Sequence, residues 1–79
     1  MIRVYVKTGF CAPCIATKRD MDKEGVDYDP VPLETVPDWQ IREWQEQGHM
    51  EAPIVDTGTE VWSGYRPDRI KNLVKEEAA

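Results

Sequence analysis

Hydrophobic and polar residues alternate at the start of the chain and then change to a longer period. Positions 2, 4 and 6 are apolar, whereas the positions between and after them carry Arg3, Tyr5 and Lys7. This period of two predicts a β-strand over residues 2–7. Beyond Phe10 the spacing becomes three and four residues, as on one face of an α-helix, through Cys14, Thr17, Met21 and Gly25. We therefore predict a helix over residues 11–25, because glycine commonly ends helices.

A second strand is predicted over residues 26–31, where the alternation returns. Pro30 and Pro32 have no backbone N–H to donate to a neighbouring strand, so this strand belongs at the edge of a sheet. A helix that connects two short strands implies that the two strands run parallel.

A second helix is predicted between residues 37 and 48. Thr35 and Asp38 are candidate N-terminal caps, and Pro37 fits the first turn. Apolar or small residues then recur at helical spacing, at Ile41, Trp44 and Gly48. Gly48 is the expected end of this helix.

The last third of the chain predicts a β-hairpin followed by a helix. Residues 54–55 and 61–62 are apolar pairs that flank a turn containing Gly58. Pro67 is suited to open the final helix, which has one apolar stripe formed by Ile70, Leu73 and Val74. The order is thus βαβ, then α, then ββα, and the 79 residues fit one α/β domain.

Composition excludes several classes of function. Ten Lys and Arg against fifteen Asp and Glu give a net charge of −5, with no basic run to neutralise nucleic acid. The longest uncharged stretch, residues 8–17, is too short to span a membrane, and the N-terminus lacks the apolar core of a signal peptide. We therefore expect a cytoplasmic protein with no nucleic-acid or membrane partner, and we expect it to be a monomer.

The sequence Cys11-Ala12-Pro13-Cys14 carries the candidate chemistry. It follows a predicted strand and begins a predicted helix, whose N-terminus has unpaired N–H groups and a partial positive charge. This environment favours a thiolate, so Cys11 at the exposed helix start is the candidate nucleophile. Cys14, one turn further on the apolar face, is placed to resolve a mixed disulfide formed by Cys11.

Two other interpretations of the cysteine pair remain open. The pair can be an inert part of the core, because free cysteines behave as small hydrophobic residues. It can also bind metal, although structural zinc takes four ligands and the chain adds only His49 to the two cysteines. A metal or cluster bridging two copies needs only the pair from each copy. We predict no metal and no bound cofactor.

Longer motifs make the chain similar to a known family. The βαβ start, the Cys-x-x-Cys motif and the Ala52-Pro53 pair resemble the thioredoxin fold in its smallest, glutaredoxin-like form, a four-stranded mixed sheet flanked by three helices. Residues 11–17 and 21–25 look like the active-site helix of the NrdH-redoxins. Their Trp-Ser-Gly-(Phe or Tyr)-Arg-Pro signature resembles Trp62-Ser63-Gly64-Tyr65-Arg66-Pro67-Asp68.

The resemblance implies a small dithiol protein that reduces protein disulfides. Members of the family are electron donors to class Ib ribonucleotide reductase and are recharged by thioredoxin reductase. The chain departs from them at Ala12-Pro13, where members commonly carry a bulkier residue and Gln, and this pair is closer to the Gly-Pro of thioredoxins. The alternatives are a glutathione-dependent glutaredoxin and, in another class, a metal-binding or iron–sulfur module.

The resemblance also implies roles for residues outside the cysteine pair. Pro53 is expected to be a cis-proline facing the cysteines, so that the backbone at Ala52 pairs with an extended substrate segment. Lys7 occurs at a similar place in glutaredoxins and NrdH-redoxins alike. Trp62 either packs in the core or donates its indole N–H within the following turn. Arg66 either holds that turn or contacts acidic partners.

Overall fold

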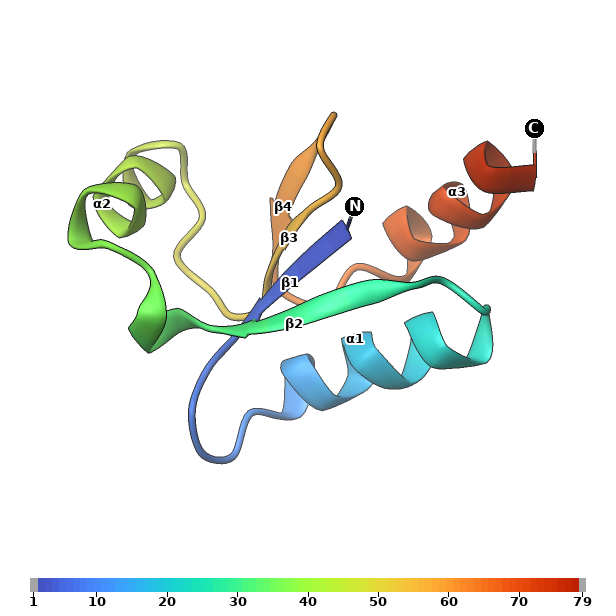
Figure 1. The fold of residues 1–79 in the computed structure, drawn as a ribbon, viewed down its shortest axis with the longest axis horizontal. Coiled ribbons are helices and arrows are strands. Elements are labelled where there is room, and N and C mark those ends of the chain that lie inside the picture. Colours follow the sequence, from blue (N-terminus) through green and yellow to red (C-terminus); the bar gives the residue numbers. More distant parts are fainter. Residues whose placement is uncertain (1, 79) are drawn as a thin grey trace.

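The computed structural model describes residues 2–78, with side chains described as far as Leu73. It has a four-stranded mixed sheet with strand order β2-β1-β3-β4 and helices on both faces (Figure 1). The elements are β1 (Ile2–Val6), α1 (Ala12–Lys23), β2 (Tyr28–Pro32), α2 (Asp38–Glu46), β3 (Ile54–Asp56), β4 (Val61–Ser63) and α3 (Pro67–Ala78). The predicted order of strands and helices is confirmed.

Strand β1 lies in the middle of the sheet and is buried on both faces. It pairs in parallel with β2 and antiparallel with β3. Val4 is fully buried, as the alternation predicts, but Tyr5 on the opposite face is also buried, at 8% exposure. The sequence pattern places Tyr5 among the polar positions. It is covered because α2 packs over that face, where Trp44 lies against its ring with centroids 4.8 Å apart.

Helix α1 ends as the glycine pattern predicts. Gly25 has φ +71°, and the N–H of Val26 donates to the carbonyl of Met21 at 2.9 Å. This bond closes the last turn in the way typical of a glycine-terminated helix. Strand β2 starts two residues later than predicted, because Val26 lies in the connection, where it is buried in the core. The predicted edge position of β2 is confirmed.

The start of α2 differs from the prediction. Neither Thr35 nor Asp38 caps the helix, whose N-cap is Pro37 without a side-chain hydrogen bond. The hydroxyl of Thr35 instead donates to the carbonyl of Pro32, within a 3-10 turn over Leu33–Thr35 that the sequence did not indicate. A short polar side chain before a helix can bond to several nearby backbone groups, so its presence does not settle which group it binds. Gly48 ends the helix with φ +91°, as predicted.

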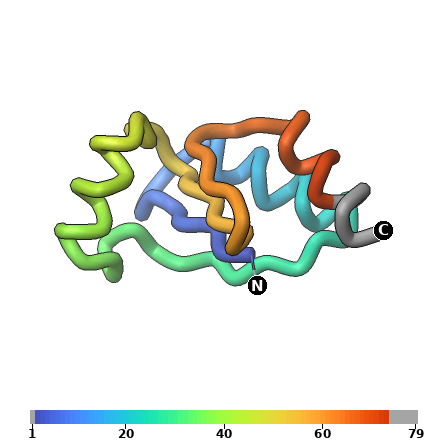
Figure 2. Tube along the Cα trace, turned by 90° about the horizontal axis from the view of Figure 1, so that it is seen from above, coloured from blue at the N-terminus to red at the C-terminus, as the bar shows by residue number. Residues whose placement is uncertain are grey.

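Two hydrophobic clusters lie on opposite faces of the sheet. The larger is covered by α1 and α3, which lie side by side (Figure 2). Its buried members are Ile2, Val4, Met21, Val26, Val55, Trp62, Ile70 and Leu73. The smaller lies under α2 and consists of Tyr5, Trp44 and Ile54. The predicted stripe of α3 is confirmed for Ile70 and Leu73, whereas the side chain of Val74 lies outside the described residues.

Candidate functional site

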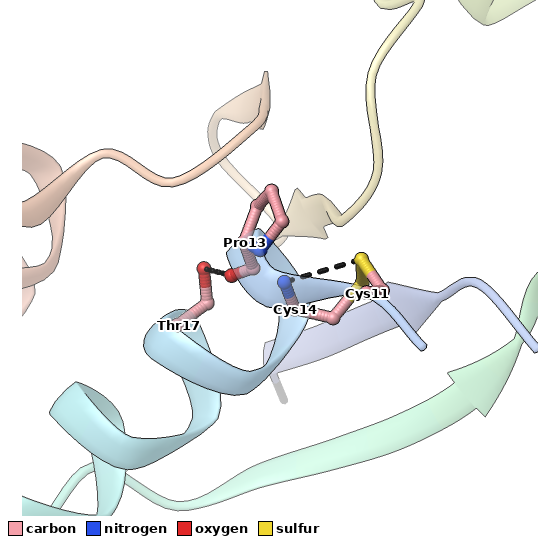
Figure 3. Close-up of a disulfide and its surroundings, with 4 residues drawn as sticks. All are labelled: Cys11, Pro13, Cys14 and Thr17. Atoms are coloured by element: carbon pink, nitrogen blue, oxygen red, sulfur yellow. Dashed lines mark hydrogen bonds between the residues drawn. A yellow bond between two sulfur atoms is a disulfide. The ribbon is translucent and has the colours of Figure 1, made fainter. Parts of the chain in front are cut away.

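The two cysteines lie at the N-terminus of α1 and are joined by a disulfide (Figure 3). Cys11 is the N-cap residue, with extended backbone angles, and its carbonyl accepts the N–H of Ile15 at 3.0 Å. Cys14 lies in the first turn, with its Cα 5.3 Å from that of Cys11. The N–H of Cys14 donates to the sulfur of Cys11 at 3.3 Å. This geometry allows the two cysteines at the start of the helix to alternate between a disulfide and a pair of thiols.

Both cysteines are buried in this disulfide-linked form. Cys14 is 3% exposed, on the same helix face as Thr17 and Met21, as predicted. Cys11 is only 8% exposed, so the prediction that it is exposed is wrong for this form. Cys11 nevertheless remains the more accessible sulfur-bearing residue of the two.

The hydroxyl of Thr17 reaches back to the start of the helix. Its Oγ1 donates to the carbonyl oxygen of Pro13 at 2.8 Å (Figure 3). Thr17 has no solvent exposure, and this bond satisfies its buried hydroxyl. The sequence predicted that Thr17 lies on the buried face of α1, but it did not predict this hydrogen bond. A helical threonine commonly donates its hydroxyl to the carbonyl four residues earlier, so the helix prediction could have indicated Pro13 as the acceptor.

A hollow of about 390 Å³ opens beside Cys11. Its lining brings together residues from three separate segments: Lys7, Phe10, Cys11, Ala12, Pro13, Glu51 and Ala52. A neighbouring hollow of about 350 Å³ shares Lys7, Glu51 and Ala52 and extends toward α2. The structure thus places Lys7 and Ala52 in the lining of the hollow at Cys11. It adds Phe10, which is 82% exposed, and Glu51, neither of which the sequence analysis singled out.

The Ala52-Pro53 peptide bond is cis, as expected. Pro53 is buried directly before β3, and its carbonyl accepts the N–H of Gly64 at 2.8 Å. Gly64 has φ +78°, and a Cβ at this position would lie 2.9 Å from Oε2 of Glu51. The segment that begins at Trp62 is therefore attached by its backbone to the loop that borders the cysteine site. The attachment connects Pro53 and Gly64, whose proximity in the fold the local sequence pattern did not predict.

Trp62 is a core residue. It is 3% exposed in the larger cluster, and its indole N–H has no hydrogen-bond partner among the described residues. The alternative in which Trp62 donates within the following turn is therefore wrong. Three residues later in the same segment, the hydroxyl of Tyr65 donates to Asp20 on α1, and this bond raises the pKa of Tyr65 above its usual value. Tyr65 thus ties the turn to the active-site helix.

Arg66 and Asp68 form an ion pair across the start of α3. The guanidinium and carboxylate lie 3.4 Å apart, and both side chains are about half exposed or more. The hydrogen bond from Arg66 holds the pKa of Asp68 below its usual value. The carbonyl of Arg66 accepts the N–H groups of Arg69 and Ile70, so it closes the first turn that Pro67 opens. The interpretation of Arg66 as a side chain that holds the turn agrees with these contacts.

Among the described residues there is neither a metal-binding cluster nor a helix suited to span a membrane. Among them, no group of three or more His, Cys, Asp and Glu side chains is placed to hold a metal ion. His49 lines the second hollow rather than the one at the cysteines. No helix within residues 2–78 has both the length and the apolar character needed to cross a bilayer.

Comparison with known proteins identifies close relatives along nearly the whole chain. The glutaredoxin-like protein NrdH of Escherichia coli K12 is 36% identical over 72 residues, which cover 91% of this chain and 86% of the relative. The NrdH protein of Salmonella typhimurium is 38% identical with the same coverage. No protein-family model matches the chain.

Solved structures give the same result. The glutaredoxin-like NrdH-redoxin from Escherichia coli, described as having a thioredoxin-like activity profile, superposes with a TM-score of 0.77 and 36% identity. It matches 91% of this chain and 92% of its own. The thioredoxin-like protein BC3987 superposes with a TM-score of 0.72 at 22% identity over 92% of this chain and 99% of its own, a likeness of fold alone. The glutaredoxin-like thioredoxin fold expected from the motifs is confirmed.

Proposed function

Because this chain belongs to the NrdH family of glutaredoxin-like thiol–disulfide oxidoreductases, we propose that its clients are protein disulfides and that thioredoxin reductase recharges it. The client we propose is class Ib ribonucleotide reductase. The observation that carries the chemistry is the Cys11–Cys14 disulfide at the start of α1, with the Cys14 N–H directed at the Cys11 sulfur. The partners follow from the resemblance of residues 11–25 and 62–68 to the family motifs.

In the reduced protein, Cys11 acts as the nucleophile. Its thiolate attacks one sulfur of the client disulfide, forms a mixed disulfide and releases the first client thiolate. Cys14 then loses its proton to solvent and attacks the Cys11 sulfur, which releases the second client thiolate and leaves the Cys11–Cys14 disulfide. Two electrons pass to the client, and the two client thiolates take up two protons. The dithiol of a flavoprotein reductase returns the pair to its reduced form by the same exchange.

Residues beside the cysteines support both steps. Lys7 lines the hollow next to Cys11, and a nearby cation favours the thiolate over the thiol. Ala52 lines the same hollow, and we propose that its backbone pairs with an extended client segment that approaches the disulfide. Pro53 anchors this loop to the Gly64 turn through its carbonyl. We propose that Ala52 and Pro53 form the docking edge for clients.

The contacts of Asp68 favour thioredoxin reductase over glutathione as the reductant. In glutaredoxins the corresponding segment carries a Gly-Gly turn and an acidic residue that hold glutathione. Here Arg66 and Pro67 replace part of that turn, and the carboxylate of Asp68 is already paired with Arg66 at 3.4 Å. Pro67 also lacks an N–H to offer to a ligand carboxylate. The tripeptide should therefore lose part of its binding site.

A comparison of two reducing systems tests the proposal. The oxidised protein is given NADPH with thioredoxin reductase, or NADPH with glutathione and glutathione reductase, and NADPH oxidation is followed with one disulfide substrate. We expect the thioredoxin reductase rate to saturate with protein concentration and the glutathione rate to rise almost linearly with glutathione. Saturable turnover with glutathione, and none with thioredoxin reductase, would show a glutaredoxin instead.

The client is tested separately. Oxidised class Ib ribonucleotide reductase is supplied with this protein, thioredoxin reductase and NADPH, and deoxyribonucleotide formation is measured. The wild-type chain should support multiple turnovers, whereas Cys11→Ser should support none. Equal turnover with and without the wild-type chain would remove ribonucleotide reductase from its clients.

A further inference from the structure

We propose that Thr17 is a positioning residue for the nucleophile, and that it acts on Cys11 through the peptide group joining Pro13 to Cys14. The inference rests on the proposed function for the role of Cys11. The hydroxyl of Thr17 donates to the carbonyl of that peptide at 2.8 Å. The N–H of the same peptide donates to the Cys11 sulfur at 3.3 Å. The two hydrogen bonds therefore share one amide, as Figure 3 shows.

A peptide group transmits polarisation between its two ends. A hydrogen bond accepted by its oxygen withdraws charge from the nitrogen side and makes the N–H a stronger donor, so hydrogen bonds in a chain strengthen one another. The Thr17 hydroxyl thus increases the attraction of the Cys14 N–H for negative charge on the Cys11 sulfur. The effect is larger for the thiolate than for the thiol, because bonds to charged acceptors are the stronger ones.

The surroundings make this arrangement effective. Thr17 has no solvent exposure and Cys14 is 3% exposed, so water does not compete for either group. Cys11 is the N-cap, and its sulfur takes the place of the oxygen that usually accepts a first-turn N–H. Pro13 contributes no N–H of its own to the first turn, and the N–H of Cys14 is the backbone donor that contacts the sulfur. Lys7 and Glu51 are the charged residues that line the hollow at Cys11, and the variants below leave both unchanged.

Three variants separate the hydroxyl from the packing of the side chain. Thr17→Val keeps the shape and removes the hydroxyl, whereas Thr17→Ser keeps the hydroxyl and removes a buried methyl group. Thr35→Val is the matched control, because Thr35 also donates to a proline carbonyl at 2.8 Å but in an exposed turn outside the cysteine site. Each reduced protein is alkylated with iodoacetamide across a pH series, and mass spectrometry assigns the product to Cys11. Urea unfolding is measured in parallel.

Thr17→Val should raise the pKa of Cys11 by roughly 0.2 to 0.6 of a pH unit. It should also shift the equilibrium with a reference dithiol toward the Cys11–Cys14 disulfide, because the thiolate of the reduced form is less stabilised. Thr17→Ser should leave the Cys11 pKa at the wild-type value while lowering stability through the lost methyl group. Thr35→Val should leave the pKa unchanged.

Either of two results would overturn the inference. One is an unchanged Cys11 pKa in Thr17→Val, and the other is an equal shift in Thr17→Ser, which would assign the effect to packing. The titration needs neither client nor reductase. If the wild-type chain reduced no client disulfide while Thr17→Val still shifted the pKa, the proposed function would fail and the role of Thr17 would stand.

Discussion

At the scale of single residues, Cys11 combines two tasks in one sulfur atom. Helix N-caps are usually Ser, Thr, Asp or Asn, whose oxygen accepts an N–H of the first turn. Here the Cys11 sulfur accepts the N–H of Cys14. The same contact is placed to stabilise negative charge on this sulfur once the disulfide is reduced. The Cys-x-x-Cys spacing predicted this position at the helix start, but it did not predict the burial of Cys11 that the disulfide-linked form shows.

Replacing each cysteine with serine should separate the two proposed roles. Cys11→Ser should abolish disulfide reduction, because the serine hydroxyl does not form the thiolate on which exchange depends. Cys14→Ser should keep the attacking thiolate and accumulate a mixed disulfide that is not resolved. Non-reducing mass spectrometry after mixing with a disulfide-containing client measures both outcomes. Normal turnover by Cys14→Ser would contradict the two-cysteine route.

At the scale of elements, the turn between β4 and α3 joins three segments that are distant in sequence. Gly64 donates its N–H to Pro53 in the loop before β3, and Tyr65 donates its hydroxyl to Asp20 on α1. The sequence predicted the hairpin and the start of α3 from local signals such as Gly58 and Pro67. It could not predict these links, because local periodicity carries no information about pairing between remote segments.

Gly64→Ala should weaken both the fold and the reaction with proteins. An L-residue in this left-handed conformation costs about 1–2 kcal/mol, and the new Cβ would displace the carboxylate of Glu51, 2.9 Å away. Urea unfolding should show the loss of stability, and the rate with a protein disulfide should fall because Glu51 lines the hollow at Cys11.

Gly58→Ala is the control for this experiment. Gly58 also has positive φ, at +94°, but its Cβ position has no neighbour within 4 Å. Its stability loss should therefore be similar, while the rate with a protein disulfide stays at the wild-type value. Equal rate losses in the two variants would indicate a general effect of destabilisation.

At the scale of the whole molecule, one sheet separates two apolar clusters, and the strands β1 and β3 each contribute buried residues to both. Val4 of β1 lies in the larger cluster under α1 and α3, and Tyr5 lies in the smaller one under α2. The order of elements and the parallel β1–β2 pair followed from the sequence alone. The burial of both faces of β1 did not, because α2 supplies the second cover and its position depends on tertiary packing.

Shortening a side chain to alanine should lower the free energy of unfolding by different amounts in the two clusters. In both cases unfolding should remain a single cooperative transition. Met21→Ala removes a side chain with no exposure from the larger cluster and should lower the free energy of unfolding by about 2–5 kcal/mol. Ile41→Ala removes a half-buried side chain beside the smaller cluster and should cost less. Both variants should unfold in a single transition, because β1 joins the clusters. Separate transitions in urea would show that the α2 side unfolds on its own.

The prolines of β2 have a further consequence for the behaviour of the protein in concentrated solution. Backbone N–H directions repeat every two residues along a strand, so the nitrogens of Pro30 and Pro32 share one side of β2. Because neither nitrogen can donate to the ladder with β1, we infer that this side is the outer one. A foreign strand that approaches this edge meets no N–H donor at either position. The opposite edge strand, β4, has only three residues. Neither rim of the sheet therefore offers a long template for amyloid-like growth, and the protein should remain dispersed at high concentration.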